Sequence, residues 1–489
     1  MALESPTHSA RTSRRALLGA LAAMVPAPAA AQIRTPGAPA PLRLQDPFLK
    51  LLQRTTYGPT DADVSEVYGR GFDRYVEDQL DPANIPDADC DQRLTTFATI
   101  GQTAQELYTV PSSTTVTNDI AWATMARAVY SKRQLFERVC EFWADHFHTN
   151  ISIVGIHKTV EMRQVYRQHT FGTFVDMLNA SAASTAMIIY LNSDRNTRTA
   201  PNQNYAREVM ELHTLGVNGG YTQQDVAEVA RCFTGWRYYG STGDARAGTS
   251  YFDRTRHDTN PKTVLGNTIA SGGGIEDGLR VLQILAHHPS TARFVSTKLL
   301  RWLLTEQPST TLVDDIAGEF TRTGGDIKAV IRRILTYENV AAATPLFKRP
   351  FHYVASGLRA LRADVTRYDT LRSTYLGSMG HTPFTWGPPD GYPHEFVYWG
   401  TLVLPRWNFA FNLPNGSVGG AVVDIPRLFA GASTATQIAD RIDTLLFREE
   451  MPRTDKAALV TFLRPDPPTA TRIRDAVGLA LASPAFQWH

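Results

Sequence analysis

Cysteine is scarce in this sequence. Cys90, Cys140 and Cys232 are its three thiols among 489 residues. So few cysteines do not form the disulfide framework on which many small exported proteins depend. Cys140 and Cys232 each lie inside an apolar helical pattern, which predicts small buried core residues, although one disulfide stays open as an alternative.

Several catalytic motifs are also missing. The sequence contains no Gly-x-Ser-x-Gly, no phosphate-binding loop, no His-Glu-x-x-His and no Cys-x-x-Cys. These absences argue against the common serine hydrolases, ATPases, zinc proteases and c-type haem attachment.

Neither sign of charge is in surplus once the N-terminus is set aside. Ser13–Leu18 (SRRALL) resembles a twin-arginine export signal, and Ala29–Ala31 offers a cleavage site that would leave a chain starting near Gln32. Removing residues 1–31 takes away three arginines and one glutamate, which leaves 46 basic and 46 acidic residues. This balance predicts no nucleic-acid partner.

The apolar run at Ala16–Val25 is too short to span a bilayer, which disfavours a membrane anchor. We therefore expect a periplasmic or secreted protein with no integral membrane segment in the mature chain. Proteins exported by the twin-arginine route are already folded and often loaded with a cofactor. The export signal therefore favours a bound cofactor, such as a divalent metal.

Residues 32–46, rich in Pro, Ala and Gln, are expected to be a flexible lead-in. From residue 47 to 489 the apolar residues recur with a period near 3.6, which predicts an all-α protein, a large multi-helix orthogonal bundle in one domain. A subdomain break near 340–350 is an alternative. The one β-like region is Trp236–Leu265, where two aromatic segments flank a Gly/Ser-rich turn, as in a small hairpin insertion.

The stretch Asn202–Trp236 is the densest in chemically active side chains. A helix is predicted over Tyr205–Leu215 and ends before Gly216, and a second begins with the capping box of Thr222 and Asp225. Asn204, Glu208 and Glu211 share one face of the first helix. His213 lies about 140° from Glu208 and faces elsewhere unless the last turn unwinds.

A second cluster is EFWADHFH at 141–148. Glu141, Asp145 and His148 fall on one helical face, which suits a metal or an acid–base pair, whereas His146 points away from that face. The alternative is a salt-bridged helix end with histidines favoured by the helix dipole.

The third cluster is His257–Asp258 with Lys262, where Asp258 either orients the histidine or only shapes the turn. Lys298 either binds an anion or lies along the core surface. An aromatic loop, Trp386–Pro393 with Trp399, either lines a cleft for a flat ligand such as a sugar or plugs the helical core.

Several stretches together resemble a bacterial family of exported proteins catalogued as domain of unknown function 1800. The stretches are RTTYGPT (54–60), EFWADHF (141–147), HTFGTFVDML (169–178), AMIIYLN (186–192), NYARE with ELHTLGVNGGYTQQDV (204–226), FTGW (233–236), HD with KTVLG (257–266), HPSTARFVSTKLL (288–300), KRPFHYV (348–354) and PPDGYP (388–393). Gln203 stands where the family usually has Glu, and Ala144 where many members have His. The resemblance implies an exported location and no particular reaction.

The leading hypothesis is an exported hydrolase whose pocket gathers carboxylates and histidines, with or without a metal, and acts on a polysaccharide or another surface polymer. The expected catalytic residues are Asp145, His146, Glu208, Glu211, His213, His257 and Asp258. A metal would be held by Asp145, His146 and Glu208. The expected substrate-binding residues are Arg207, Lys262, Lys298, Trp386, Tyr392 and Trp399. Two alternatives are a non-catalytic module that binds a surface polymer or partner protein, and a haem protein with His146 or His213 as axial ligand.

Overall fold

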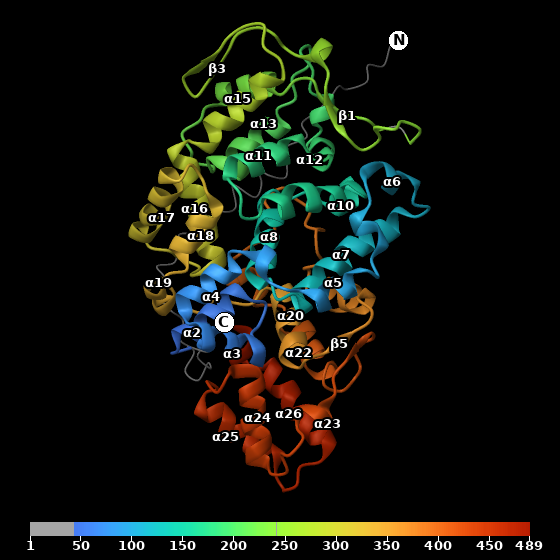
Figure 1. Ribbon diagram of the computed structural model, residues 1–489, viewed down its shortest axis with the longest axis vertical. Coiled ribbons are helices and arrows are strands. Elements are labelled where there is room, and N and C mark those ends of the chain that lie inside the picture. Colours follow the sequence, from blue (N-terminus) through green and yellow to red (C-terminus); the bar gives the residue numbers. More distant parts are fainter. Residues whose placement is uncertain (1–43, 241) are drawn as a thin grey trace, which may run out of the picture. The chain divides into compact units, whose positions relative to one another are not determined.

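The computed structural model describes residues 44–240 and 242–489, and within them the chain is all-α apart from three small two-stranded sheets (Figure 1). The predicted export signal at 1–31 lies outside the described residues, as does most of the predicted lead-in. The lead-in's last residues are described: Leu44 is buried in the core, and the Asp46 side chain caps the first helix. The predicted fold class is confirmed.

The helices of the first half, labelled as in Figure 1, are α2 (Pro47–Thr55), α3 (Asp61–Arg70), α4 (Phe72–Gln79), α5 (Ala88–Leu94), α6 (Ala104–Thr109), α7 (Ser113–Tyr130), α8 (Gln134–His146), α9 (Ile151–Val154), α10 (His157–Glu161), α11 (Phe174–Ala183), α12 (Thr185–Tyr190), α13 (Asn204–Glu208) and α14 (Gln223–Cys232). The later helices are α15 (Ile275–Ala286), α16 (Pro289–Leu303), α17 (Thr310–Arg322), α18 (Ile327–Ile334), α19 (Tyr337–Ala342), α20 (Pro350–Ala360), α21 (Phe396–Trp399), α22 (Val403–Asn412), α23 (Ile425–Leu428), α24 (Ala435–Phe447), α25 (Arg453–Leu463), α26 (Ala470–Ala482) and α27 (Pro484–Gln487). Short 3₁₀ turns are η1 (Pro82–Asn84), η2 (Ala98–Gly101), η4 (Ser193–Arg195) and η6 (Arg254–Arg256), and π-helical segments are η3 (Met162–Arg167), η5 (Val209–Thr214) and η7 (Leu371–Leu376).

The predicted hairpin is present as β1 (Trp236–Tyr238) paired antiparallel with β2 (Ser250–Phe252). The expectation of a single hairpin was incomplete, because β3 (Lys262–Val264) also pairs with β4 (Asn267–Ile269), and β5 (Asp364–Val365) with β6 (Ala421–Val422). Strands of two or three residues are too short to show an alternating pattern. The β3–β4 turn has positive φ at both Leu265 and Gly266, as tight hairpin turns require.

The buried apolar residues form two hydrophobic cores. The first runs from Leu51 to Val340 along the chain and also takes in Phe384, and the second is built mainly from residues 351–486 together with parts of α2 and α7. The residues that the structure describes nevertheless form one compact unit. Most of the chain before 340–350 belongs to the first core and most of the chain after it to the second, and a subdomain break at this interval is the alternative.

Helix α8 supplies side chains to the boundary between the two cores. It packs against α2, α4, α7 and η3, while α20 of the second core packs against α7. Its apolar face, including Leu135, Val139, Phe142 and Trp143, is buried in the first core. The opposite, polar face of α8 is therefore directed toward α20 and the loop that precedes α21.

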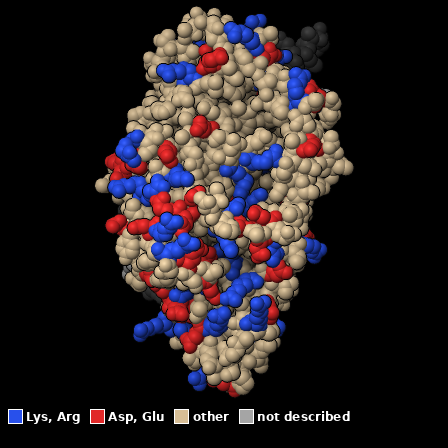
Figure 2. Space-filling model, viewed as in Figure 1, with Lys and Arg blue, Asp and Glu red and all other residues tan. Residues whose placement is uncertain are grey.

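Charged side chains of both signs are interspersed on the face of the molecule drawn in Figure 2. In the part of the chain that the structure describes, none of the helices combines the length and the hydropathy that a membrane crossing requires.

Candidate functional site

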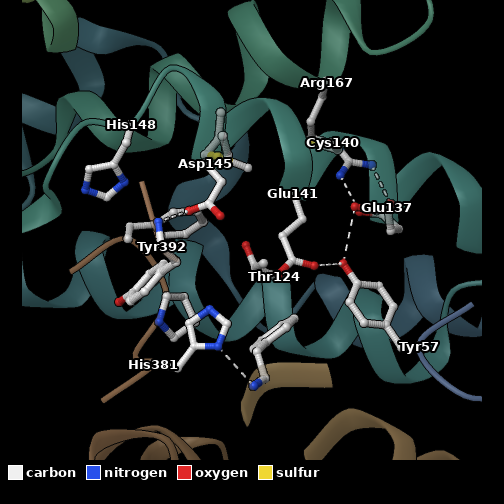
Figure 3. Close-up of a pocket in the computed structure, with 15 residues that line it drawn as sticks. Tyr57, Thr124, Glu137, Cys140, Glu141, Asp145, His148, Arg167, His381 and Tyr392 are labelled. Carbon is white, nitrogen blue, oxygen red and sulfur yellow. Dashed lines mark hydrogen bonds and ion pairs between the residues drawn. The ribbon is translucent and has the colours of Figure 1, made fainter. Parts of the chain in front are cut away.

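Three carboxylates follow one another along α8 and line a single cavity (Figure 3). Glu137, Glu141 and Asp145 are spaced by four residues, which places them one above the other on a helix face, and His148 follows after the helix ends. The cavity has a volume of about 40 Å³, which is room for a few water molecules. The stripe of Glu141, Asp145 and His148 expected from the sequence is thus part of one cavity wall.

Glu137 is locked to an arginine. Arg167 donates from Nη1 and Nη2 to the two carboxylate oxygens over 2.7 and 2.8 Å. Burial alone would raise the pKa of Glu137, but the charge and hydrogen bonds of Arg167 outweigh it and the pKa lies below its usual range. A planar two-bond pair of this kind holds both side chains in place.

Glu141 is buried among groups that do not fix its charge so firmly. Tyr57 donates its hydroxyl hydrogen to Oε2 over 2.7 Å, and His352 Nε2 lies 3.0 Å from the same oxygen. Burial raises the pKa of Glu141 above its ordinary value, although the nearby Arg349 and Arg138 act against this shift. Glu141 therefore holds a proton to higher pH than an exposed glutamate does.

Asp145 is fixed from the other side of the cavity. Arg349 donates from Nη2 to Oδ2 over 2.7 Å, and the backbone N–H of Tyr392 donates to Oδ1 over 3.0 Å. Asp145 is thus held by one charged and one neutral donor. The residue before Tyr392 is Gly391, whose α-carbon lies so close to the Asp145 carbonyl that a β-carbon there would be 2.2 Å from the oxygen.

Two histidines complete the wall in their neutral form. Burial lowers the pKa of His148 to about 4, and its Nε2 lies 2.8 Å from the Trp386 carbonyl oxygen. His381 Nδ1 accepts a hydrogen bond from the Phe351 backbone N–H, and burial and then the charge of Arg349 lower its pKa well below the ordinary value.

His146 and His213 do not line this cavity. Both are 1% exposed and lie in the first core, with their ring centroids 6.1 Å apart and Phe147 packed against each. His146 Nε2 lies 3.0 Å from the His213 carbonyl oxygen, while His146 Nδ1 and His213 Nε2 have no hydrogen-bond partner among the described residues. Burial lowers the pKa of His213 to about 3. As the helical spacing predicted, His146 points away from the carboxylate stripe.

The predicted helix over Tyr205–Leu215 is α13 followed by the wider π-helical turn η5. Glu208 and Glu211 are half-buried on it, and Glu211 is hydrogen-bonded to Tyr221. Arg207 donates to Gln203 and Gln223. None of these residues is part of the lining of the α8 cavity.

His257, Asp258 and Lys262 belong to a separate buried network. His257 Nε2 and Lys262 Nζ lie 3.1 and 2.6 Å from the same oxygen of Asp277. Asp258 is paired with Arg231 over 2.7 Å. The three predicted clusters are thus tied to different partners and do not form one shared cavity wall.

No three His, Cys, Asp or Glu side chains of the described residues are grouped as a metal ion requires. The predicted ligands Asp145, His146 and Glu208 are not brought together, so the donor set does not fit a metal. The rings of His146 and His213 are likewise closely packed by phenylalanines, an environment that does not fit a haem.

The predicted substrate-binding residues are divided between surface and interior. Tyr392 lines the cavity, and Trp386 is half-buried beside it with its Nε1 bonded to Asp390. Trp399 is 1% exposed and stacked on His381, so it supports the cavity wall from behind and offers no surface to a ligand. Lys298 is partly buried, and burial lowers its pKa to about 8.

Sequence reasoning missed Tyr57, Arg349 and His352 as site residues, and it did not select Glu141 over its neighbours. Each of the missed residues lies in a stretch that carries the family resemblance: RTTYGPT holds Tyr57, and KRPFHYV holds Arg349 and His352. Their position in these stretches was the signal that could have identified them.

Comparison with known proteins gives one match. The family model described as "Protein of unknown function (DUF1800)" matches residues 50–488. No curated protein and no solved structure matches the chain.

Proposed function

The chain belongs to the DUF1800 family, whose description names no activity, and we propose that it is a hydrolase in which Glu141 and Asp145 act as proton donor and base. The observation that carries the proposal is the pairing of two carboxyl groups with different partners in one water-sized cavity. Burial raises the pKa of Glu141, whereas Asp145 is held by an arginine and a backbone N–H. A pair of this kind is how an enzyme keeps an acid and a base side by side at one pH.

The spacing on α8 suits the chemistry. Residues four apart on a helix have β-carbons roughly 5 to 6 Å apart. Two carboxyl groups on one helix face can therefore act on one linkage, one as the proton donor and the other as the base that activates a water. The side chains of Asp145 and Glu141 keep 13% and 14% of their exposure, so solvent reaches both.

In the proposed reaction, water adds across the bond that is cleaved. The leaving oxygen takes the proton of Glu141, and the water oxygen bonds to the carbon while its proton passes to Asp145. Tyr57 and His352 orient Glu141, and Arg349 orients Asp145. His148 is neutral, since burial lowers its pKa to about 4, and serves as a wall of the cavity.

A polymer fits the size of the site better than a small molecule does. The cavity holds only a few waters, so a chain would lie over it with one linkage at Glu141 and Asp145. Beyond the Trp386–Pro393 loop, the segment 396–407 exposes large apolar side chains, among them Tyr398 at 45% and Trp407 at 48%. Exposed apolar patches of this kind mark interaction surfaces. Together with the predicted export signal, they support a polysaccharide or similar surface polymer, met in the periplasm or outside the cell.

A second candidate function is a non-catalytic module that binds such a polymer. The specific observation in its favour is that every α8 carboxylate in the cavity has a side-chain partner, as a network that only holds helices in register would have.

Substitution separates the two candidates. We expect purified protein to release reducing ends from members of a panel of bacterial and plant polysaccharides, and both Glu141→Gln and Asp145→Asn to lower that rate at least about 100-fold. Because Glu141 must be protonated to act, activity should fall as pH rises through its raised pKa, and the residual activity of Glu141→Gln should lack that alkaline limb.

Glu319→Gln is the matched control, since Glu319 is paired with Arg322 on the distant helix α17. It should keep full activity. Polymer retention without release of reducing ends would favour the binding module. Unfolding free energies that drop by about 3 kcal/mol in both site variants would show that the carboxylates are structural.

A further inference from the structure

A second cavity lies behind the Glu141–His352 and Asp145–Arg349 contacts and has three arginines in its lining. These are Arg138, Arg301 and Arg349, and Glu306 is the one acidic side chain among the lining residues, which also include His489. Its volume is about 30 Å³, the space of two or three water molecules. Arg349 and His352, which orient Asp145 and Glu141 in the proposed hydrolysis, also line this cavity, but no step of that hydrolysis takes place in it.

The Trp302 ring is in contact with two of these arginines. The guanidinium carbons of Arg138 and Arg349 lie 5.2 and 5.0 Å from the centre of the Trp302 ring. The ring is itself fixed, because its Nε1 donates to the Arg138 carbonyl oxygen over 3.0 Å. Stacking on an aromatic ring holds guanidinium groups in a set orientation before any ligand arrives.

The two stacked arginines are almost wholly buried, yet part of their hydrogen-bonding capacity is unused. Arg138 is 1% exposed and Arg349 is 4% exposed. Among the described residues, Arg138 Nε and both Nε and Nη1 of Arg349 have no acceptor. Buried donors without acceptors are costly, and guanidinium groups are matched in shape to the oxygens of carboxylate, phosphate and sulfate.

Two histidines of the lining, His352 and His394, add no fixed charge, because burial lowers the pKa of each. His352 and His394 each stand edge-on to Trp302, with ring centroids 5.3 and 5.6 Å from it. Burial lowers the pKa of His394 well below its ordinary value, and the charges of Arg349 and Lys298 lower it further. Because Arg349 is already paired with Asp145, what the cavity offers an anion is the unused hydrogen-bonding capacity of the guanidinium groups.

We propose that this cavity, between Arg138, Arg301 and Arg349 on the Trp302 ring, is a binding site for a small oxyanion: a phosphate, a sulfate or a carboxylate group. An oxyanion would offer the unpaired guanidinium nitrogens charged acceptors, which water does not. Arg301 is exposed at the rim, so the anion enters from that side either free or as a group on a larger molecule.

The proposal does not rest on hydrolysis, because it is tested by binding alone. The probes are inorganic phosphate, sulfate and acetate, each titrated against the full protein by calorimetry and by thermal unfolding. A fourth probe is glucose 6-phosphate, in which the same oxyanion is carried by a sugar. We expect saturable binding of at least one inorganic probe at millimolar concentration, and tighter binding of the sugar phosphate if the natural ligand is a larger molecule.

The variant that tests the site is Arg301→Gln, since Arg301 is exposed and its loss should leave the fold intact. The loss of one charged hydrogen-bond donor should weaken binding about tenfold or more. Arg293→Gln is the matched control: it removes the same charge from the same helix, α16, but Arg293 does not line the cavity. It should bind as the wild type does.

Two results would overturn the proposal. The first is the absence of saturable binding for every probe. The second is an equal rise in unfolding temperature for wild type, Arg301→Gln and Arg293→Gln, because sulfate and phosphate stabilise proteins in general by exclusion from their surfaces. Loss of hydrolysis in Glu141→Gln with anion binding unchanged would separate this site from the proposed catalytic one.

Discussion

At the scale of single residues, Lys348 has an unusual environment for a charged side chain. It is 3% exposed, its Nζ donates to Ser356 Oγ over 3.1 Å, and the ammonium group lies 3.8 Å from the centre of the Phe486 ring. Burial, followed by the charge of Arg406, lowers its pKa from 10.5 to about 7. The folded protein therefore prefers this lysine neutral above that pH.

The lowered pKa of Lys348 makes the stability of the folded protein depend on pH. Between a pH of about 7 and 10.5 the unfolded chain holds a proton on Lys348 that the folded protein does not, so stability is lost as pH falls through this window. Replacing the lysine by an apolar side chain of similar length removes that loss.

We therefore expect Lys348→Met to be more stable than wild type near pH 6, by on the order of 3 kcal/mol, with the difference shrinking as pH rises toward 10. Chemical denaturation at several pH values measures both. Lys456→Met is the contrast, because Lys456 is paired with Asp440 and Asp443 and its loss should destabilise the protein. A Lys348→Met variant that is less stable than wild type at every pH would contradict the prediction.

Residues whose partners are close in the sequence were predictable, and those with distant partners were not. The capping boxes of Thr60 with Asp63 and of Thr222 with Asp225 follow from spacing and are present. Asp145 is a predicted site residue, but its partner Arg349 lies 204 positions away. No periodicity or local motif connects two such residues, because their contact depends on how whole helices pack.

At the scale of elements, the segment 388–393 likewise has a local feature that was predictable and a distant contact that was not. Its Pro and Gly content predicted a loop, and the structure has one there. Its tight docking against α8 was not predictable. Gly391 has φ of 76°, and a β-carbon at this position would clash with the Asp145 carbonyl oxygen. This close approach places the Tyr392 N–H within hydrogen-bond distance of the Asp145 carboxylate.

Gly391→Ala should therefore be destabilising by at least about 2 kcal/mol, because the left-handed backbone and the contact with Asp145 both oppose a β-carbon. It should also lower any hydrolytic activity by displacing the donor to Asp145. Gly387→Ala in the same loop is the control, since nothing lies within 4 Å of its added β-carbon. Urea unfolding of the two variants tests this, and equal stabilities would show that the loop is not held by this contact.

In the helix predicted over Tyr205–Leu215, a π-helical segment changes which side chains face the core. Its second half is π-helical, with the Leu215 N–H bonded to the Met210 carbonyl five residues earlier. The wider turn leaves His213 buried in the first core while Glu208 and Glu211 stay half-buried. The sequence allowed for an unwound turn but could not decide that it occurs, since a π-turn depends on tertiary packing.

At the scale of the whole molecule, composition and period were enough for the fold class, because every helix carries its own apolar face. They were not enough to predict the site, because the packing of the two cores decides which polar helix faces meet. The three clusters in the sequence looked alike, but only the α8 cluster lines the cavity that Glu141 and Asp145 share.

The two cores are joined by buried arginines whose partners lie in the other part of the chain. Arg359 on α20 donates to the carbonyl oxygen of Gly58 over 2.6 Å and to Asp63 Oδ2 over 2.9 Å, and Arg349 is bonded to Asp145. Separating the cores would leave these guanidinium groups and carbonyls without partners, at a cost of about 1 to 3 kcal/mol for each group. The two cores should therefore lose their structure together.

We expect differential scanning calorimetry of the wild-type protein to show a single unfolding transition, although chains of this length often unfold in steps. Near-ultraviolet circular dichroism provides a second measurement, because Trp143 and Trp302 lie in the first core while Trp399 is stacked on His381, which packs against Phe351 of the second. Both measurements should give the same midpoint. Arg359→Met, which removes the hydrogen bonds to Gly58, Val129 and Asp63 at once, should lower that midpoint and broaden or divide the transition. Two separate transitions in the wild type would instead show that residues before and after 340–350 fold independently, as the alternative interpretation of the sequence allowed.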